Sequence, residues 1–137
     1  MDYTGLTLRI AADSMKGTNR STKQDRTAVC LGWVEGLGWA VVPTTSSWKA
    51  PWQRPIRQSG SGWRGWDLRY RKTIHWTPNV VMYLSSDEIA AAWDRNPMIG
   101  WAPDDVVNHG IDELEHAIDH NLMGIQNWFN QPGLSRD

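Results

Sequence analysis

The chain has 137 residues, of which 40% are hydrophobic and 21% charged, a balance typical of one soluble globular domain with a real core. No apolar run approaches the roughly 20 residues of a membrane-spanning helix, and the first ten residues lack the basic and apolar regions of a secretory signal. The single cysteine, Cys30, excludes an internal disulfide. We therefore expect a cytoplasmic or virion-associated protein.

The net charge of −1 conceals a strong asymmetry along the chain. Residues 1–82 carry 12 Lys and Arg against 5 Asp and Glu, a net charge of +7, whereas residues 83–137 carry 2 against 10, a net charge of −8. Seven of the ten tryptophans also fall within the first 76 residues. This asymmetry predicts either oriented contacts with charged partners, including head-to-tail self-association, or mutual neutralisation of the two parts in the fold.

The first third of the chain has the patterns of β-strands. Residues 6–12 alternate between apolar and polar side chains and predict a half-buried strand, which a polar loop over residues 13–26 follows. Residues 27–34 and 39–42 flank a glycine-bearing link and predict a hairpin that Pro43 ends. Cys30 lies within this hairpin and is expected to be a buried thiol rather than a nucleophile.

Residues 44–65 are irregular, and regular alternation resumes after them. Residues 66–76 predict a strand with aromatic and aliphatic side chains inward and a row of polar, mostly cationic ones outward, namely Asp67, Arg69, Arg71, Thr73 and His75. Residues 79–84 predict a further, more buried strand.

The pattern then changes to that of helices. Ser85 and Glu88 have the spacing of a capping box, and Asn96-Pro97 would stop the helix that it begins. Pro103, followed by two aspartates, would open a second helix, whose apolar stripe would consist of Val107, Ile111, Leu114, Ile118, Leu122, Ile125 and Phe129.

Strands first and helices last predict an α+β fold in a single domain, residues 1–137. An antiparallel sheet of about five strands would occupy residues 1–84. The two helices, within residues 85–130, would cover one face of the sheet, and residues 131–137 would form a loose tail.

The segment DELEHAIDH, residues 112–120, resembles the active-site helix of zincin metallopeptidases, in which HExxH supplies two zinc ligands and a general base. Aspartate replaces the first histidine of that motif. The resemblance implies a degenerate zinc-dependent hydrolase in which Glu113 is the base and the metal ligands are Asp112, His116 and His120. The alternative is that these side chains line a solvated or interface face without metal, which we prefer.

Residues 48–76 combine tryptophans with cations and contain a single acid, Asp67. Cations neutralise phosphates and exposed aromatic rings stack on bases, so this segment could bind single-stranded nucleic acid. Tryptophan and arginine are equally the residues enriched at protein–protein hot spots. The candidate contact residues for either partner are Trp48, Trp52, Arg54, Arg57, Trp63, Arg64, Arg69 and Arg71.

The sequence favours a non-enzymatic interaction or assembly protein without a cofactor. The cationic Trp/Arg-rich loop and the acidic helix would be its opposed contact surfaces, toward a protein partner or another copy of the chain. A small phage-encoded structural component, such as a neck, tail or decoration protein, would have this size and composition. The alternatives are the nucleic-acid-binding protein and the zincin-like hydrolase; no membrane partner is expected.

Overall fold

A seven-stranded antiparallel sheet and two α-helices make up the fold of the computed structural model, which describes residues 1–10, 26–46, 50–58, 60–65, 73–96 and 100–123. In chain order its elements are β1 (Leu6–Ile10), β2 (Arg26–Val34), β3 (Gly38–Thr45), β4 (Arg64–Gly65), β5 (His75–Trp76), the 3₁₀ helix η2 (Pro78–Val80), β6 (Met82–Leu84), α1 (Ser86–Arg95), β7 (Gly100–Trp101) and α2 (Asp104–Asp119). The α+β class is therefore confirmed.

The β2–β3 hairpin is the centre of the sheet, whose strand order is β4-β7-β1-β2-β3-β5. One edge of β3 pairs with β6 at Trp39–Val41 and with β5 at Thr44–Thr45. The predicted hairpin is confirmed, but the prediction that Pro43 ends its second strand is wrong. Pro43 lies opposite Ala28 inside the ladder, and its carbonyl accepts a hydrogen bond from the Thr77 N–H.

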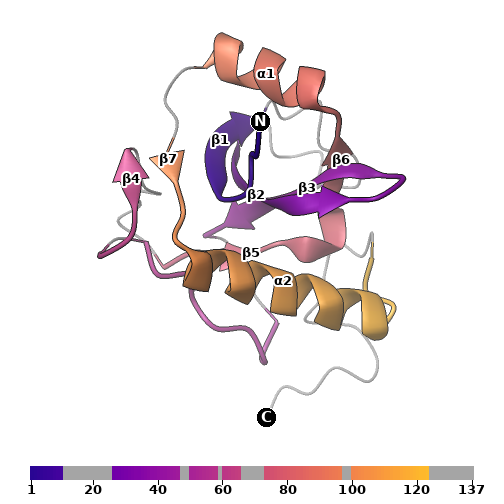
Figure 1. The fold of residues 1–137 in the computed structure, drawn as a ribbon. Coiled ribbons are helices and arrows are strands. Elements are labelled where there is room, and N and C mark those ends of the chain that lie inside the picture. Colours follow the sequence, from indigo (N-terminus) through magenta and orange to yellow (C-terminus); the bar gives the residue numbers. More distant parts are fainter. Residues whose placement is uncertain (11–25, 47–49, 59, 66–72, 97–99, 124–137) are drawn as a thin grey trace.

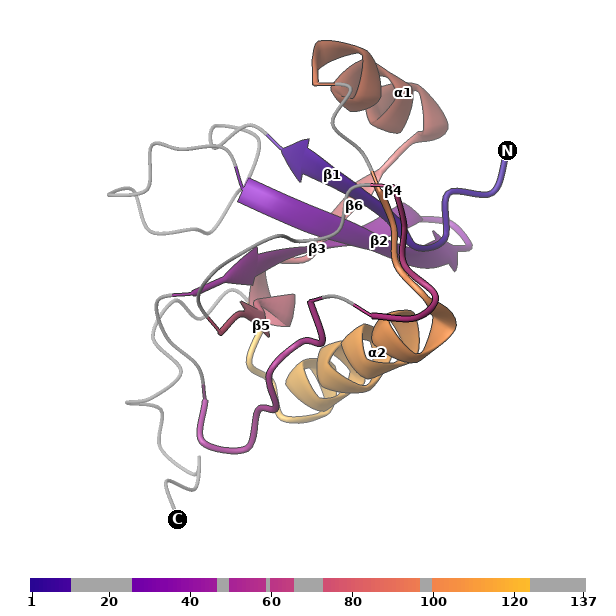
Figure 2. The same ribbon diagram turned by 90° about the vertical axis from the view of Figure 1, so that its left-hand side faces the viewer.

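The two helices lie on opposite faces of the sheet (Figures 1 and 2), which corrects the prediction that both cover one face. Alternate residues of β2 supply the two cores. Ala28 and Cys30 face the α1 side together with Ile89, whereas Val29 and Leu31 face the α2 side together with Leu114. Strands covered on both faces need apolar residues at successive positions, which is why residues 28–31 form an unbroken apolar run.

Burial also decides the state of the single thiol. Cys30 has no exposed surface, and burial raises the pKa of its thiol to about 12. The predicted inert, buried cysteine is confirmed.

The second half of the chain departs from the predicted strands. Of the strand predicted over residues 66–76, residues 66–72 lie outside the described part and the structure shows only β5. His75, expected on the outer face, is only 6% exposed, because β5 lies inside the fold against β3 with both of its residues buried. Of residues 79–84, only Met82–Leu84 form a strand, since Pro78 begins the short helix η2.

Both helices begin where the sequence predicts. The Ser85 hydroxyl accepts from the Glu88 N–H, and the Glu88 carboxylate accepts from the Ser85 N–H, which completes the capping box of α1. Helix α2 begins at Asp104 but ends at Asp119, well before the predicted stripe does. Asn121 takes a positive φ of 55°, and the Leu122 N–H donates to the Ala117 carbonyl, a closure that ends helices.

Helix α2 approaches the sheet through Gly110. A Cβ atom at this position would lie 2.7 Å from Leu31 Cδ2 and 2.9 Å from Trp76 Cζ2. Both distances are shorter than real Cβ contacts, so the absence of a side chain at Gly110 sets how closely the helix packs.

We predict that Gly110→Ala lowers the free energy of unfolding by about 1–3 kcal/mol, because the added methyl group overpacks the contact with Leu31 and Trp76. The sign of the change in the free energy of unfolding distinguishes a packed glycine from an exposed one. At a solvent-exposed helix position the same change raises stability, by up to about 1 kcal/mol. Urea unfolding monitored by circular dichroism measures the difference, with Glu115→Ala on the exposed side of α2 as the control. An unchanged or increased free energy of unfolding for Gly110→Ala would contradict the packing described above.

Candidate functional site

A segment without helix or strand, residues 50–57, lies against α2 and is called here the anchored loop. Every third residue of this loop is buried: Ala50 is 0% exposed, Gln53 5% and Ile56 3%. The Ile56 N–H donates to the Ile74 carbonyl over 2.9 Å. The inward side of the loop is therefore packed against the rest of the protein, whereas Arg54, Pro55 and Arg57 are exposed.

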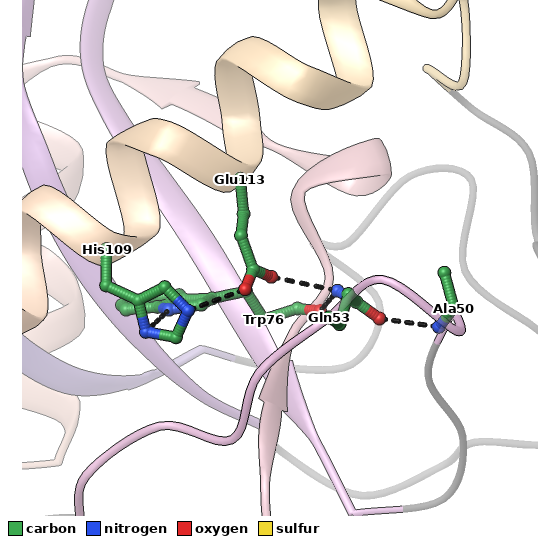
Figure 3. Close-up of polar contacts among 5 residues, drawn as sticks. All are labelled: Ala50, Gln53, Trp76, His109 and Glu113. Carbon is green, nitrogen blue, oxygen red and sulfur yellow. Dashed lines mark hydrogen bonds and ion pairs between the residues drawn. The ribbon is translucent and has the colours of Figure 1, made fainter. Parts of the chain in front are cut away.

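The side-chain amide of Gln53 makes the central contacts of this loop (Figure 3). Its oxygen accepts from the Ala50 N–H over 2.7 Å. Its nitrogen donates both to the Trp76 carbonyl at 2.9 Å and to Glu113 Oε1 at 3.0 Å. One buried side chain thus joins the loop to β5 and to α2, and satisfies three groups that would otherwise be buried without partners.

The buried carboxylate of Glu113 also forms a hydrogen bond with His109 within α2. Its Oε2 lies 2.6 Å from His109 Nε2, one helical turn earlier, and the carboxylate is 5% exposed. The indole N–H of Trp76 donates to His109 Nδ1 over 3.4 Å. Because an indole nitrogen can only donate, Nδ1 accepts and Nε2 carries the proton that His109 gives to Glu113. Both ring nitrogens of His109 are therefore engaged.

Aromatic rings cover α2 beside this network. Trp52 of the anchored loop packs on His116 with ring centroids 3.9 Å apart, and His116 stacks on His120 at 4.0 Å and 19°. Burial lowers the pKa of His116, the positive charge on a protonated His120 lowers it further, and Glu113 and Asp119 act weakly in the opposite direction. The stack therefore favours the neutral imidazole.

An open hollow of about 470 Å³ lies between the exposed side of the anchored loop and the first turns of α2. The Arg57 guanidinium donates to both carboxylate oxygens of Asp105, with Nη2 to Oδ1 at 2.9 Å, and this holds the pKa of Asp105 below its ordinary value. Arg54 makes no ion pair or hydrogen bond within the described residues. The full lining is Arg54, Pro55, Arg57, Asp105, Val106, Asn108, His109 and Asp112.

The eight residues predicted to contact a partner do not all lie on one surface. Trp52, Arg54 and Arg57 come together on the anchored loop. Trp63 instead packs against the α2-side core, and Arg64 lies over the Trp101 ring at 5.7 Å from its centroid. The remaining three, Trp48, Arg69 and Arg71, lie outside the described residues.

The described residues do not have the geometry that a zincin-like metal site requires. Within the described residues, no group of three or more His, Cys, Asp or Glu side chains is placed to hold one metal ion. Glu113, its expected base, is buried in hydrogen bonds to His109 and Gln53 rather than aligned on the polar side of α2. Of the predicted apolar stripe of α2, Val107, Leu114 and Leu122 are buried and Ile111 packs against the core, whereas Ile118 is 48% exposed. Ile125 and Phe129 lie outside the described residues.

Two features of the site were not predicted from the sequence. Gln53 was not singled out, because a glutamine within an irregular segment has no local pattern that reveals its partners. The His109–Glu113 contact does have a signal, an i,i+4 spacing on a helix, which places two side chains side by side.

No protein-family model matches this chain, and no curated protein or solved structure is significantly similar to it. Within the described residues, no helix is long and apolar enough to cross a membrane. The function is therefore argued from the site alone.

We predict that Gln53→Ala releases the anchored loop and destabilises the protein, by about 1–3 kcal/mol for each buried group left without a partner. Hydrogen exchange should show faster exchange of the Ala50 amide, which loses its acceptor. Arg54→Ala, in the same loop but exposed, is the matched control and should leave this exchange unchanged. Undiminished protection of Ala50 in Gln53→Ala would show that the amide does not hold the loop.

We predict that His116 makes stability depend on pH. Its folded-state pKa lies below the ordinary 6.5, so the unfolded chain binds the proton more readily. The contribution of His116 is therefore complete above pH 6.5 and is lost as the pH falls from 6.5 through the folded-state pKa. Urea unfolding at a series of pH values measures this loss, and His116→Phe keeps an aromatic ring but should lack this component. An NMR titration that gives His116 a pKa of 6.5 or higher would refute the prediction.

Proposed function

We propose that this protein is a non-enzymatic interaction and assembly domain whose binding surface is the exposed side of the anchored loop together with the first turns of α2. The observation that carries this proposal is the fixation of a loop without secondary structure by the buried Gln53 amide. Binding surfaces gain affinity when their contact residues are ordered before the partner arrives. Trp52 and Arg57 are ordered in this way, by His116 and by Asp105.

The state of two side chains, His109 and Cys30, supports a binding role over a catalytic one. A general base needs a nitrogen free to accept the substrate proton. Both nitrogens of His109, the histidine that lines the hollow, are engaged by Glu113 and Trp76. The Cys30 thiol is fully buried, and its pKa of about 12 keeps it protonated at neutral pH.

The charges of the hollow favour a protein partner over nucleic acid. Arg54 and Arg57 share the lining with Asp105 and Asp112, and Arg57 is already paired with Asp105. A phosphate chain would meet these carboxylates as well as the arginines. A protein surface that carries both signs of charge can complement such a lining. A structural subunit that repeats within a larger particle would be one form of such an assembly.

We predict that the purified protein self-associates as its concentration rises and that Arg54→Ala weakens this association. Sedimentation velocity over a concentration series measures it, and thermal unfolding confirms that the variant is folded. The control is Arg95→Ala, an exposed arginine on α1, on the opposite face of the sheet. A chain that remains monomeric up to millimolar concentration would overturn self-assembly.

The nucleic-acid alternative is tested separately, by fluorescence anisotropy with a labelled single-stranded oligonucleotide at low salt. We expect no binding that depends on Arg54 and Arg57. Tight binding that falls steeply with salt and is lost in Arg54→Ala would overturn the preference for a protein partner.

A further inference from the structure

The tip of the β2–β3 hairpin is an exposed apolar patch. Of the six large hydrophobic residues that are exposed in the described part of the chain, three lie within five consecutive positions: Trp33 at 53%, Val34 at 37% and Leu37 at 58%. The turn is closed by the Leu37 N–H, which donates to the Val34 carbonyl, and Gly36 supplies the positive φ of 81° that it requires. A compact group of apolar side chains at a protruding tip marks a site of contact.

The indole ring of Trp33 is exposed but held in place. It packs edge-on against Trp39, with ring centroids 5.4 Å apart and an interplanar angle of 72°, and its N–H donates to Glu35 Oε2 over 3.2 Å. Trp39 is itself fixed, by an edge contact with Tyr3 and a hydrogen bond to Ser86. A tryptophan that is already ordered loses little entropy on binding and is the usual anchor of a protein–protein contact.

The chemistry of the tip complements that of the hollow. The tip carries one charge, the carboxylate of Glu35, beside the Trp33 ring. The hollow offers Arg54, which has no partner in the described residues, beside the apolar surface of Pro55. Its volume of about 470 Å³ is within the range of roughly 300–1,000 Å³ that accommodates drug-sized ligands.

The hollow is lined by the anchored loop and α2, and the tip joins β2 to β3. The β2–β3 tip lies apart from the anchored loop in Figures 1 and 2, so we expect the tip and the hollow to meet between two copies. We propose that the β2–β3 tip of one copy docks into the hollow of a second copy, with Glu35 against Arg54 and Trp33 on Pro55. This proposal rests on the assembly function above and names its partner, a second copy of this chain. The contact is head-to-tail, so repetition of it generates a ring or an open filament.

Charge reversal tests the pairing directly. Glu35→Arg and Arg54→Glu each place like charges in the contact, and each should weaken self-association about tenfold or more. The double variant Glu35→Arg/Arg54→Glu restores opposite charges and should recover it. An equimolar mixture of the two single variants contains two favourable contacts, that of the Glu35→Arg tip with the Arg54→Glu hollow and that of the unchanged Glu35 tip with the unchanged Arg54 hollow. The mixture should therefore associate again, with the two variants in alternation, although each variant alone does not.

Sedimentation velocity at several salt concentrations measures all of these species. Glu35→Gln keeps an acceptor for the Trp33 indole, so it separates loss of charge from loss of ring position, and Asp94→Arg on α1 is the control for a charge reversal elsewhere. If the wild-type chain associates but neither single reversal weakens it, or the double variant does not recover, the docking proposal is wrong and the assembly function stands. If the wild-type chain is monomeric, both the docking contact and self-assembly are overturned.

Discussion

The position of the anchored loop depends most on one buried side chain, that of Gln53, with the hydrogen bond from the Ile56 N–H to the Ile74 carbonyl as a second anchor. The loop has no ladder or helical hydrogen bonds of its own, and the Gln53 amide connects it to β5 and α2 at the same time. The ion pair beside it contributes little to stability, since Arg57 and Asp105 are 39% and 67% exposed and water screens them. The buried amide therefore holds the loop in place, whereas the exposed ion pair only orients the Arg57 side chain.

The parts of the fold that could be predicted are those with local signals. The hairpin, the capping box of α1 and the start of α2 each follow from a few adjacent residues. The predictions that were wrong concern features that depend on tertiary contacts. The two helices were predicted on one face of the sheet. The continuous apolar run at residues 28–31 is consistent with burial on two sides, but no local pattern assigns a particular helix to each face. Glu113 was predicted only as the base of the zincin-like site. A carboxylate is seldom buried, and hydrogen bonds from Gln53 and His109 satisfy it here.

The charge asymmetry of the chain is partly neutralised within the fold. The basic, tryptophan-rich part and the acidic helix were expected to form opposed surfaces, but the anchored loop of the basic part lies on α2, where Arg57 meets Asp105 and Trp52 covers His116. Only part of the positive charge therefore remains available to a partner. Of the two arginines and two aspartates that line the hollow, Arg57 and Asp105 form an ion pair, and Arg54 and Asp112 form none within the described residues.

The burial of Cys30 makes this thiol a built-in reporter of unfolding. It lies on β2, between the neighbouring strands β1 and β3, and has no exposed surface. An alkylating reagent can reach it only when the central strands separate, and the high pKa leaves almost no thiolate to react before they do. The alkylation rate of the native chain therefore measures how often the middle of the sheet opens, independently of fraying at the loops and termini.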